Sequence, residues 1–91
     1  MEVRWSERAY NDLERIFVHV SHENPAAARA VIKTIYDGCA MLKTLPNRGR
    51  IGRMPGRREL VFQALPYIAV YQVKPNAVEI SRIYHAAQNW P

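Results

Sequence analysis

The feature that most constrains the fold of this 91-residue chain is an apolar run at residues 67–73, YIAVYQV. β-Branched and aromatic residues dominate the run, which favours a β-strand. Because almost every position is apolar, both faces of that strand must be covered. The run is therefore expected in the middle of a sheet, and the rest of the chain must supply neighbouring strands and a covering layer.

Three further segments show the alternation of polar and apolar residues that is typical of strands covered on one face. They are residues 2–5, residues 58–63 and residues 78–84. A turn at residues 65–66 precedes the apolar run, and Lys-Pro-Asn-Ala at residues 74–77 follows it as a hairpin turn. The C-terminal part of the chain is therefore expected to form adjacent antiparallel strands.

Two amphipathic helices are predicted between the first and second strands. After Ser6, a good N-cap, apolar residues recur at helical spacing over about residues 7–22. Asn24 and Pro25 then give a second start signal, and the next apolar stripe continues to about Lys43. Only two or three residues separate the helices, so an antiparallel helical hairpin is expected.

The predicted order of elements is β-α-α-β-β-β. It describes one α+β domain over residues 1–91, with the helical hairpin packed on a small antiparallel sheet. The single cysteine, Cys39, cannot form an internal disulfide, so a reducing cytoplasm is the expected location. No segment approaches a membrane span, and the absence of Cys and His clusters predicts neither a metal nor a cofactor.

Positive charge is concentrated in residues 43–58, KTLPNRGRIGRMPGRR. The chain has 13 Lys and Arg against 8 Asp and Glu, a net charge of +5. This stretch holds six of the cations and no acid, which leaves 7 cations against 8 acids elsewhere, a balance of −1. Pro and Gly interrupt regular structure there, so a basic loop is expected. Local charge of this kind indicates a polyanion site, and the alternative is a solvated loop that only aids solubility.

Four motifs give the chain a resemblance to a known family. ENPAAA opens the second predicted helix, and PGRREL, PYIAVYQV and VEISRIYHAAQNWP follow in the C-terminal half. In order and over essentially the whole chain, they resemble the RelE/ParE superfamily of bacterial toxins. The resemblance implies a toxin that its co-encoded protein antitoxin binds and silences in a hetero-oligomer. RelE-like members cleave mRNA in the ribosomal A site, and ParE-like members inhibit DNA gyrase.

The resemblance also implies site residues. Arg58 matches the arginine that opens the second strand of RelE-like nucleases, and Arg82 matches the arginine near the end of the last strand. His85 falls where some members carry a catalytic histidine or a basic residue. Arg48, Arg50 and Arg53 lie where RelE carries lysines. The sequence departs from RelE at the C-terminal catalytic tyrosine, because Tyr84 precedes His85 and Trp90 lies beyond it.

Metal-independent RNA cleavage needs a base, an acid and cations for the extra phosphate charge. Histidine is the side chain whose unperturbed pKa lies near neutrality, and arginine can hold a phosphate in a bidentate manner, so His85, Arg58 and Arg82 are the expected catalytic residues. The expected phosphate ligands are Arg48, Arg50, Arg53 and Arg57, and the expected base-stacking residues are Tyr84 and Trp90. Simpler alternatives are carboxylate pairs for Arg58 and Arg82, a backbone hydrogen bond for His85 and a packing role for Trp90.

Strand alternation limits the catalytic hypothesis. It puts Arg82 on the face of Val78 and Ile80, opposite His85, so Arg82 and His85 share a site only if the strand bulges or ends before His85. An Arg-x-x-His ending also occurs in ParE-like members. Ribosome-dependent mRNA cleavage is therefore the first hypothesis, and non-catalytic gyrase inhibition is the alternative. In either case we expect an acidic antitoxin segment to bind a sheet edge or the helical hairpin.

Overall fold

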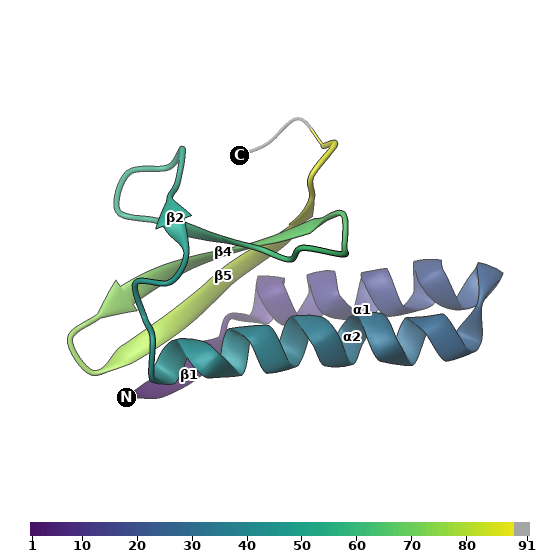
Figure 1. Ribbon diagram of the computed structural model, residues 1–91, viewed down its shortest axis with the longest axis horizontal. Coiled ribbons are helices and arrows are strands. Elements are labelled where there is room, and N and C mark those ends of the chain that lie inside the picture. The colour runs from purple at the N-terminus through teal and green to yellow at the C-terminus, as the bar shows by residue number, and fades with distance from the viewer. Residues whose placement is uncertain (89–91) are drawn as a thin grey trace.

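The computed structural model of the chain describes residues 1–88 and has two layers. Helices α1 (Glu7–Glu23) and α2 (Pro25–Ala40) lie side by side against one face of a five-stranded sheet (Figure 1). A short 3-10 helix, η1 (Met41–Lys43), continues α2 and leads into the basic loop. The structure confirms the predicted α+β class, with a helical hairpin on a small sheet.

The sheet has the strand order β1-β5-β4-β3-β2. The strands are β1 (Glu2–Trp5), β2 (Arg50–Ile51), β3 (Arg58–Val61), β4 (Tyr67–Lys74) and β5 (Ala77–His85). β4, the predicted apolar run, lies in the centre, with β3 and β5 antiparallel on either side. The sheet is nevertheless mixed rather than antiparallel, because β1 pairs in parallel with β5. Parallel pairing needs a long connection, which the intervening helices and strands provide.

The helix start signals act as the sequence predicts. The Ser6 hydroxyl accepts the Ala9 N–H at 3.0 Å, and the Asn24 side chain accepts the Ala27 N–H at 3.1 Å. Both contacts satisfy backbone donors that the first helical turn leaves open. Neither helix within residues 1–88 has the length and hydrophobicity that crossing a membrane requires.

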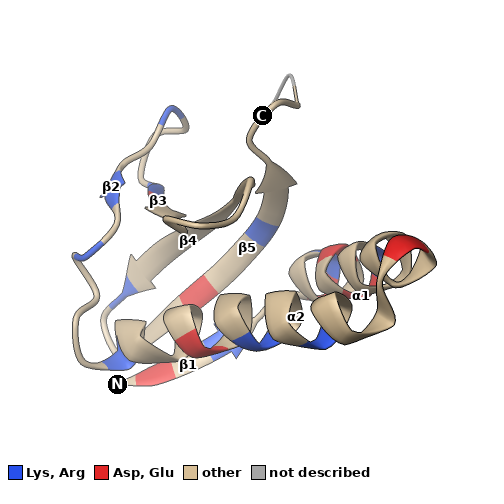
Figure 2. Ribbon diagram, turned by 45° about the vertical axis from the view of Figure 1, so that its right-hand side comes forward, with Lys and Arg blue, Asp and Glu red and all other residues tan. Residues whose placement is uncertain are grey.

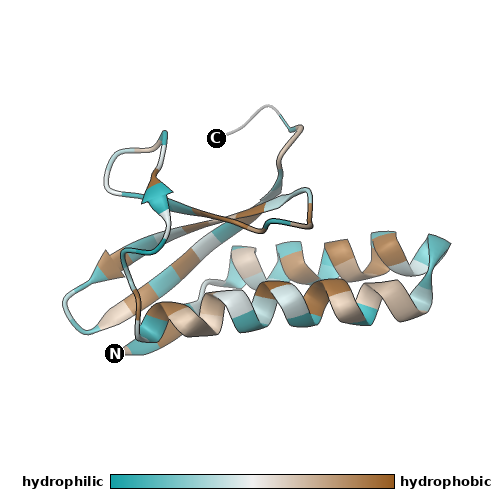
Figure 3. Cartoon of the chain, in the orientation of Figure 1, coloured by the Kyte–Doolittle hydropathy of each residue, from teal (hydrophilic) through white to brown (hydrophobic). Residues whose placement is uncertain are grey.

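The main core lies between the helical hairpin and the sheet, where apolar segments of the two layers meet (Figure 3). Its buried members are Ala9, Ile16, Ile35, Cys39, Leu42, Leu60, Phe62, Tyr67, Ala69, Tyr71, Val78, Ile80 and Ile83. Burial of Cys39 raises the pKa of its thiol to about 12. Among residues 1–88, the opposite face, which we call the outer face of the sheet, carries a small apolar cluster: Ile68 and Val70, with Met54 and Tyr84 against them.

Candidate functional site

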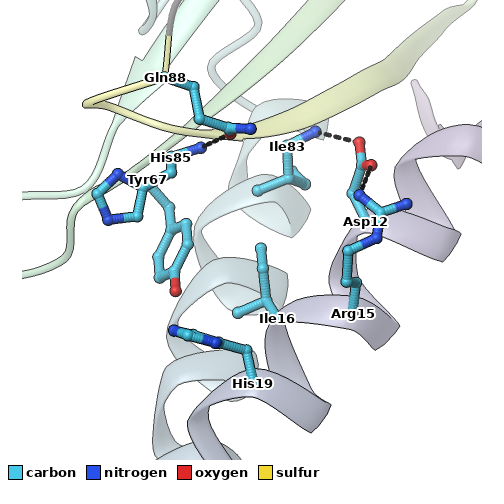
Figure 4. Close-up of a pocket in the computed structure, with 8 residues that line it drawn as sticks. All are labelled: Asp12, Arg15, Ile16, His19, Tyr67, Ile83, His85 and Gln88. Carbon is cyan, nitrogen blue, oxygen red and sulfur yellow. Dashed lines mark hydrogen bonds and ion pairs between the residues drawn. The ribbon is translucent and has the colours of Figure 1, made fainter.

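His85 lines a cavity of about 330 Å³ between α1 and one end of the sheet (Figure 4). Its ring packs edge-on against Tyr67, with 5.5 Å between the ring centroids. Its Nδ1 accepts the Ala87 N–H at 3.1 Å, so the neutral ring carries its proton on Nε2. The backbone contact that was the simpler alternative for His85 is therefore present. The cavity is lined by Asp12, Arg15, Ile16, His19, Tyr67, Ile83, His85 and Gln88.

β5 bulges before it reaches His85. Val70 lies opposite Arg82, but Tyr71 lies opposite Ile80, so β5 has one extra residue, Ser81, at this point. The bulge shifts the alternation of every later position in the strand.

As a result, Ile83 faces the helices with Ile80, whereas Tyr84 packs on the outer face of the sheet. His85 follows Ile83 to the helix side, and Arg82 shares the outer face with Tyr84. The bulge that was needed to bring Arg82 and His85 together is present. It nevertheless leaves the two side chains on opposite faces, because the extra residue precedes both of them and moves Arg82 to the outer face and His85 to the helix side.

A buried carboxylate holds the Arg82 guanidinium. Asp12 on α1 is 3% exposed and accepts hydrogen bonds from Arg82 Nε at 2.7 Å and from Nη2 at 3.1 Å. Asp12 also accepts the Ile83 N–H at 2.9 Å. The hydrogen bond to Asp12 raises the pKa of Arg82 above its ordinary value. Two donors of Arg82 therefore serve an ion pair that ties α1 to β5.

Arg58 lies elsewhere, on the helix-facing side of β3. It pairs with Tyr71 across the strands, whereas His85 pairs with Tyr67, four residues or roughly 13 Å away along β4. Arg58 Nη1 donates to the carbonyl oxygens of Gly49 at 2.7 Å and Asn47 at 3.3 Å. The three predicted catalytic residues thus occupy three different places, and the fold does not gather them into one site.

A second buried carboxylate holds the basic loop, residues 44–57, from the outer face of the sheet. Glu59 is 3% exposed, and its Oε1 lies 2.9 Å from Arg50 Nη2 and 3.0 Å from Arg50 Nε. Its Oε2 accepts the Arg53 N–H at 3.0 Å and lies 3.9 Å from Arg53 Nε. The Arg50 and Arg53 side chains stay half exposed, at 56% and 49%, so a phosphate could still reach them. Glu59 already compensates part of their positive charge, which weakens the predicted phosphate role.

Tyr71 holds the same loop from the helix-facing side. Its buried hydroxyl accepts the Gly49 N–H at 2.8 Å and donates to the Pro46 carbonyl at 2.8 Å. Burial raises the pKa of this hydroxyl. A Cβ at position 49 would lie 2.6 Å from the hydroxyl oxygen, so only glycine allows this close approach. The basic loop therefore has a defined shape, and a short strand, β2, forms where the Gly and Pro pattern predicted none.

A cavity of about 250 Å³ opens on the outer face of the sheet beside the basic loop, and we call it the arginine cavity. Arg8 from α1, Arg57 from the basic loop and Arg82 from β5 line it, and the Arg82 guanidinium carbon lies 4.9 Å from the centroid of the Tyr84 ring. The other lining residues are Ser6, Met54, Val70, Glu79 and Ser81. Arg8 was not predicted, because in the sequence it is one polar residue on an amphipathic helix.

Arg48 lies apart from this cavity. Arg48 Nη1 lies 3.8 Å from the sulfur of Met41, and Lys and Arg are spread along the basic loop rather than focused on one point (Figure 2). Trp90 lies outside the described residues. Within residues 1–88, no group of three or more His, Cys, Asp and Glu residues is arranged to hold a metal ion.

An apolar groove runs along the outer surface of the helical hairpin. It has a volume of about 270 Å³ and is lined by Tyr10, Leu13, Glu14, Phe17 and Ile32. Tyr10 is 60% exposed and Phe17 is 39% exposed, although both are large and aromatic. Contiguous exposed apolar side chains mark interaction surfaces. The sequence signal for this groove was an apolar stripe on α1 wider than the core needs.

Known proteins resemble this chain in both sequence and fold. The profile of a family described as "ParE toxin of type II toxin-antitoxin system, parDE" matches residues 3–90. A protein of Sinorhizobium fredii, described as "Putative toxin Y4kP", is 37% identical over 89 residues, which cover 98% of this chain and 92% of the relative.

Two solved structures have similar folds. A chain from the "Chromosomal ParDE TA system from P. aeruginosa" is similar with a TM-score of 0.85 and 30% identity, covering 93% of this chain and 95% of that one. A chain of the "intact E. coli RelBE toxin-antitoxin complex" is similar with a TM-score of 0.61, covering 96% and 98%, but at 15% identity this likeness shows the fold alone. This chain belongs to the ParE toxin family of type II toxin–antitoxin systems, within the RelE/ParE superfamily.

Proposed function

We propose that the protein arrests growth by binding DNA gyrase, without catalysing a reaction of its own. The observation that carries this proposal is the separation of His85, Arg58 and Arg82 onto different faces and different ends of the sheet. The match to the ParE family and the ParDE structure at 30% identity support the ParE-like branch over the RelE-like one. Action on gyrase also implies the cytoplasm as the place of work.

The separation matters because a nuclease needs its acid, base and cationic groups to meet at one phosphate. A general base or acid must lie within about 3 Å of the proton that it transfers, with cations at the same phosphate. Arg82 is paired with Asp12, Arg58 anchors the basic loop, and His85 lies in another cavity. An inhibitor that only binds its target needs none of these groups to meet.

The antitoxin is the second partner, and the two solved relatives come from toxin–antitoxin systems. We propose that an amphipathic antitoxin helix lies in the groove between α1 and α2, because Tyr10 and Phe17 leave it apolar and open. The net charge of +5 favours an acidic antitoxin segment.

Controlled expression in bacteria tests the proposal. Induction should stop growth, co-expression of the neighbouring antitoxin gene should relieve the arrest, and arrested cells should show a DNA-damage response with intact mRNA. Fragmented mRNA without DNA-damage signalling would favour the RelE-like activity instead. Normal growth with soluble, folded protein would reject the toxin function itself.

A further inference from the structure

We infer that the arginine cavity is where the toxin holds a carboxylate from an acidic segment of its protein target. This inference rests on the proposed function, since it assigns a place on the toxin to target recognition. The cavity lies on the outer face of the sheet, away from the apolar groove of the helical hairpin. Both surfaces are therefore available to different partners.

The first argument is uncompensated charge. Within residues 1–88, the side chains of Arg8 and Arg57 make no hydrogen bond or ion pair, although both line the cavity. Arg82 is paired with Asp12, which Arg15 also contacts at 3.4 Å, and Glu79 is paired with Lys74 at 3.2 Å. Two positive charges from different elements therefore remain without partners at one cavity, which favours an anionic ligand.

The second argument is an unsatisfied hydroxyl. Ser81, the extra residue of the β5 bulge, lines the cavity, and its buried Oγ has no hydrogen-bond partner among the described residues. The Ser6 hydroxyl donates to the Ser81 carbonyl at 2.9 Å, which fixes the backbone of the bulge. A buried hydroxyl without a partner is unfavourable, so an oxygen of a bound ligand would satisfy it.

The third argument is the apolar part of the lining. Met54, Val70 and the Tyr84 ring form a small apolar cluster beside the arginines. Val70 is already buried, and a free inorganic anion would leave Met54 and Tyr84 partly exposed. A protein segment in which an acidic residue stands next to an apolar one would match both parts, because the carboxylate reaches the guanidinium groups while the apolar side chain covers the cluster.

The charge pattern favours a carboxylate over the phosphates of a nucleic acid. A phosphodiester chain needs a continuous track of cations. Here the nearby Arg50 is already paired with the buried Glu59, and Glu79 lies on the cavity itself. A surplus limited to Arg8 and Arg57 fits one carboxylate better than a polyanion.

A peptide titration tests the cavity directly. The probes are a blocked peptide of alternating Leu and Glu and a control of alternating Leu and Gln, each added to the isotope-labelled, full-length toxin. The Glu peptide should shift the amide NMR signals of Arg57, Ser81 and Arg82, and the Gln peptide should not. Arg8→Ala combined with Arg57→Ala should weaken Glu-peptide binding at least tenfold.

The matched control is Arg29→Ala combined with Lys43→Ala, which removes the same number of charges from α2 and η1, outside the arginine cavity. It should bind the Glu peptide as the unmodified toxin does. Equal shifts with the Gln peptide, shifts confined to other surfaces, or full binding by the Arg8 and Arg57 double variant would each overturn the inference. Binding of a single-stranded oligonucleotide that depends on both arginines would also overturn the inference, in favour of a phosphate ligand. In that case the slope of log K against log salt concentration should be smaller by about 1.4 in the double variant, because two phosphate contacts are lost.

Purified gyrase links the cavity to function. The Arg8 and Arg57 double variant should bind gyrase at least tenfold more weakly, while its affinity for the antitoxin stays unchanged. If the unmodified toxin inhibits gyrase and the double variant inhibits it equally, the inference fails and the proposed function stands. If the unmodified toxin does not bind gyrase, the proposed function fails, and the peptide titration alone decides on the cavity.

Discussion

Two buried carboxylates, Asp12 and Glu59, hold arginines in different regions of the molecule, and each is only 3% exposed. Asp12 joins α1 to β5 at the edge of the main core, where regular elements pack on both sides. Glu59 joins β3 to the basic loop, which contributes little apolar packing beyond Met54. The same kind of ion pair therefore supports the whole domain in one region and the shape of a single loop in the other.

Because both carboxylates pair with arginines, the number of arginines in the sequence overstates the positive charge that is available to bind an anion. Arg82 and Arg50 look equally available in the sequence, but each forms an ion pair with a buried carboxylate. Arg8 and Arg57 have no such partner within residues 1–88, and they line the arginine cavity, the proposed anion site. The positions of the acids, more than those of the bases, decide where this protein can bind an anion.

The largest expected effect comes from Asp12→Ala. This change leaves the partly buried Arg82 and the Ile83 N–H without their acceptor. We expect the free energy of unfolding to fall by about 3 kcal/mol, measured by urea denaturation. Asp37→Ala is the control, because Asp37 pairs with Lys33 on the exposed side of α2 and should matter by less than about 0.5 kcal/mol. Equal losses in both variants would contradict the anchoring role of Asp12.

Tyr71→Phe should have the next largest effect. It removes the hydroxyl that contacts Gly49 and Pro46, and the buried Gly49 N–H loses its acceptor. We expect a loss of about 2 kcal/mol in urea denaturation, with the aromatic packing retained. Tyr67→Phe is the matched control on the same strand face, since the Tyr67 hydroxyl makes no hydrogen bond among the described residues. A stable Tyr71→Phe protein would show that the loop does not depend on this contact.

Glu59→Ala should have the smallest effect on global stability and a large local one. Arg50 and Arg53 are half exposed, so water can replace their lost partner, and we expect about 1 kcal/mol in unfolding free energy. Hydrogen exchange at the Arg53 amide should accelerate at least tenfold, because its acceptor is gone. Glu79→Ala, which removes a half-exposed pair with Lys74, should leave that exchange rate unchanged. If the exchange rate of the Arg53 amide were unchanged in Glu59→Ala, Glu59 would not hold the basic loop, and the contrast with Asp12 would be wrong.

The regular elements could be predicted because local patterns determine them. Helical periodicity and the caps at Ser6 and Asn24 located both helices, and the apolar run at residues 67–73 located the central strand. The parallel pairing of β1 could not be read in this way, since it depends on a partner more than 70 residues away. β2 was missed because its two residues lie in a segment rich in Gly and Pro. Side chains from other strands, Glu59 and Tyr71, hold this segment against the sheet.

The candidate site was less predictable, because its contacts are long-range. Asp12 and Arg82 are 70 positions apart, and no spacing rule connects them. The sequence shows the bulge at Ser81 as two adjacent polar residues, Ser81 and Arg82, a weak signal for a feature that decides the faces on which Arg82 and His85 lie. The sequence shows that cations are concentrated in one segment, but only the fold shows that Arg50, Arg53 and Arg58 contribute to the structure of the basic loop.

The most direct test of the central claim is a titration of gyrase supercoiling activity with the purified toxin and with its His85→Ala variant. Inhibition by binding predicts that activity falls in proportion to the toxin-to-gyrase ratio and is complete near saturation. It also predicts that the variant inhibits equally, because His85 lies outside the arginine cavity. The account would be contradicted if folded toxin left gyrase unaffected while cutting mRNA on translating ribosomes, with that cutting lost in His85→Ala.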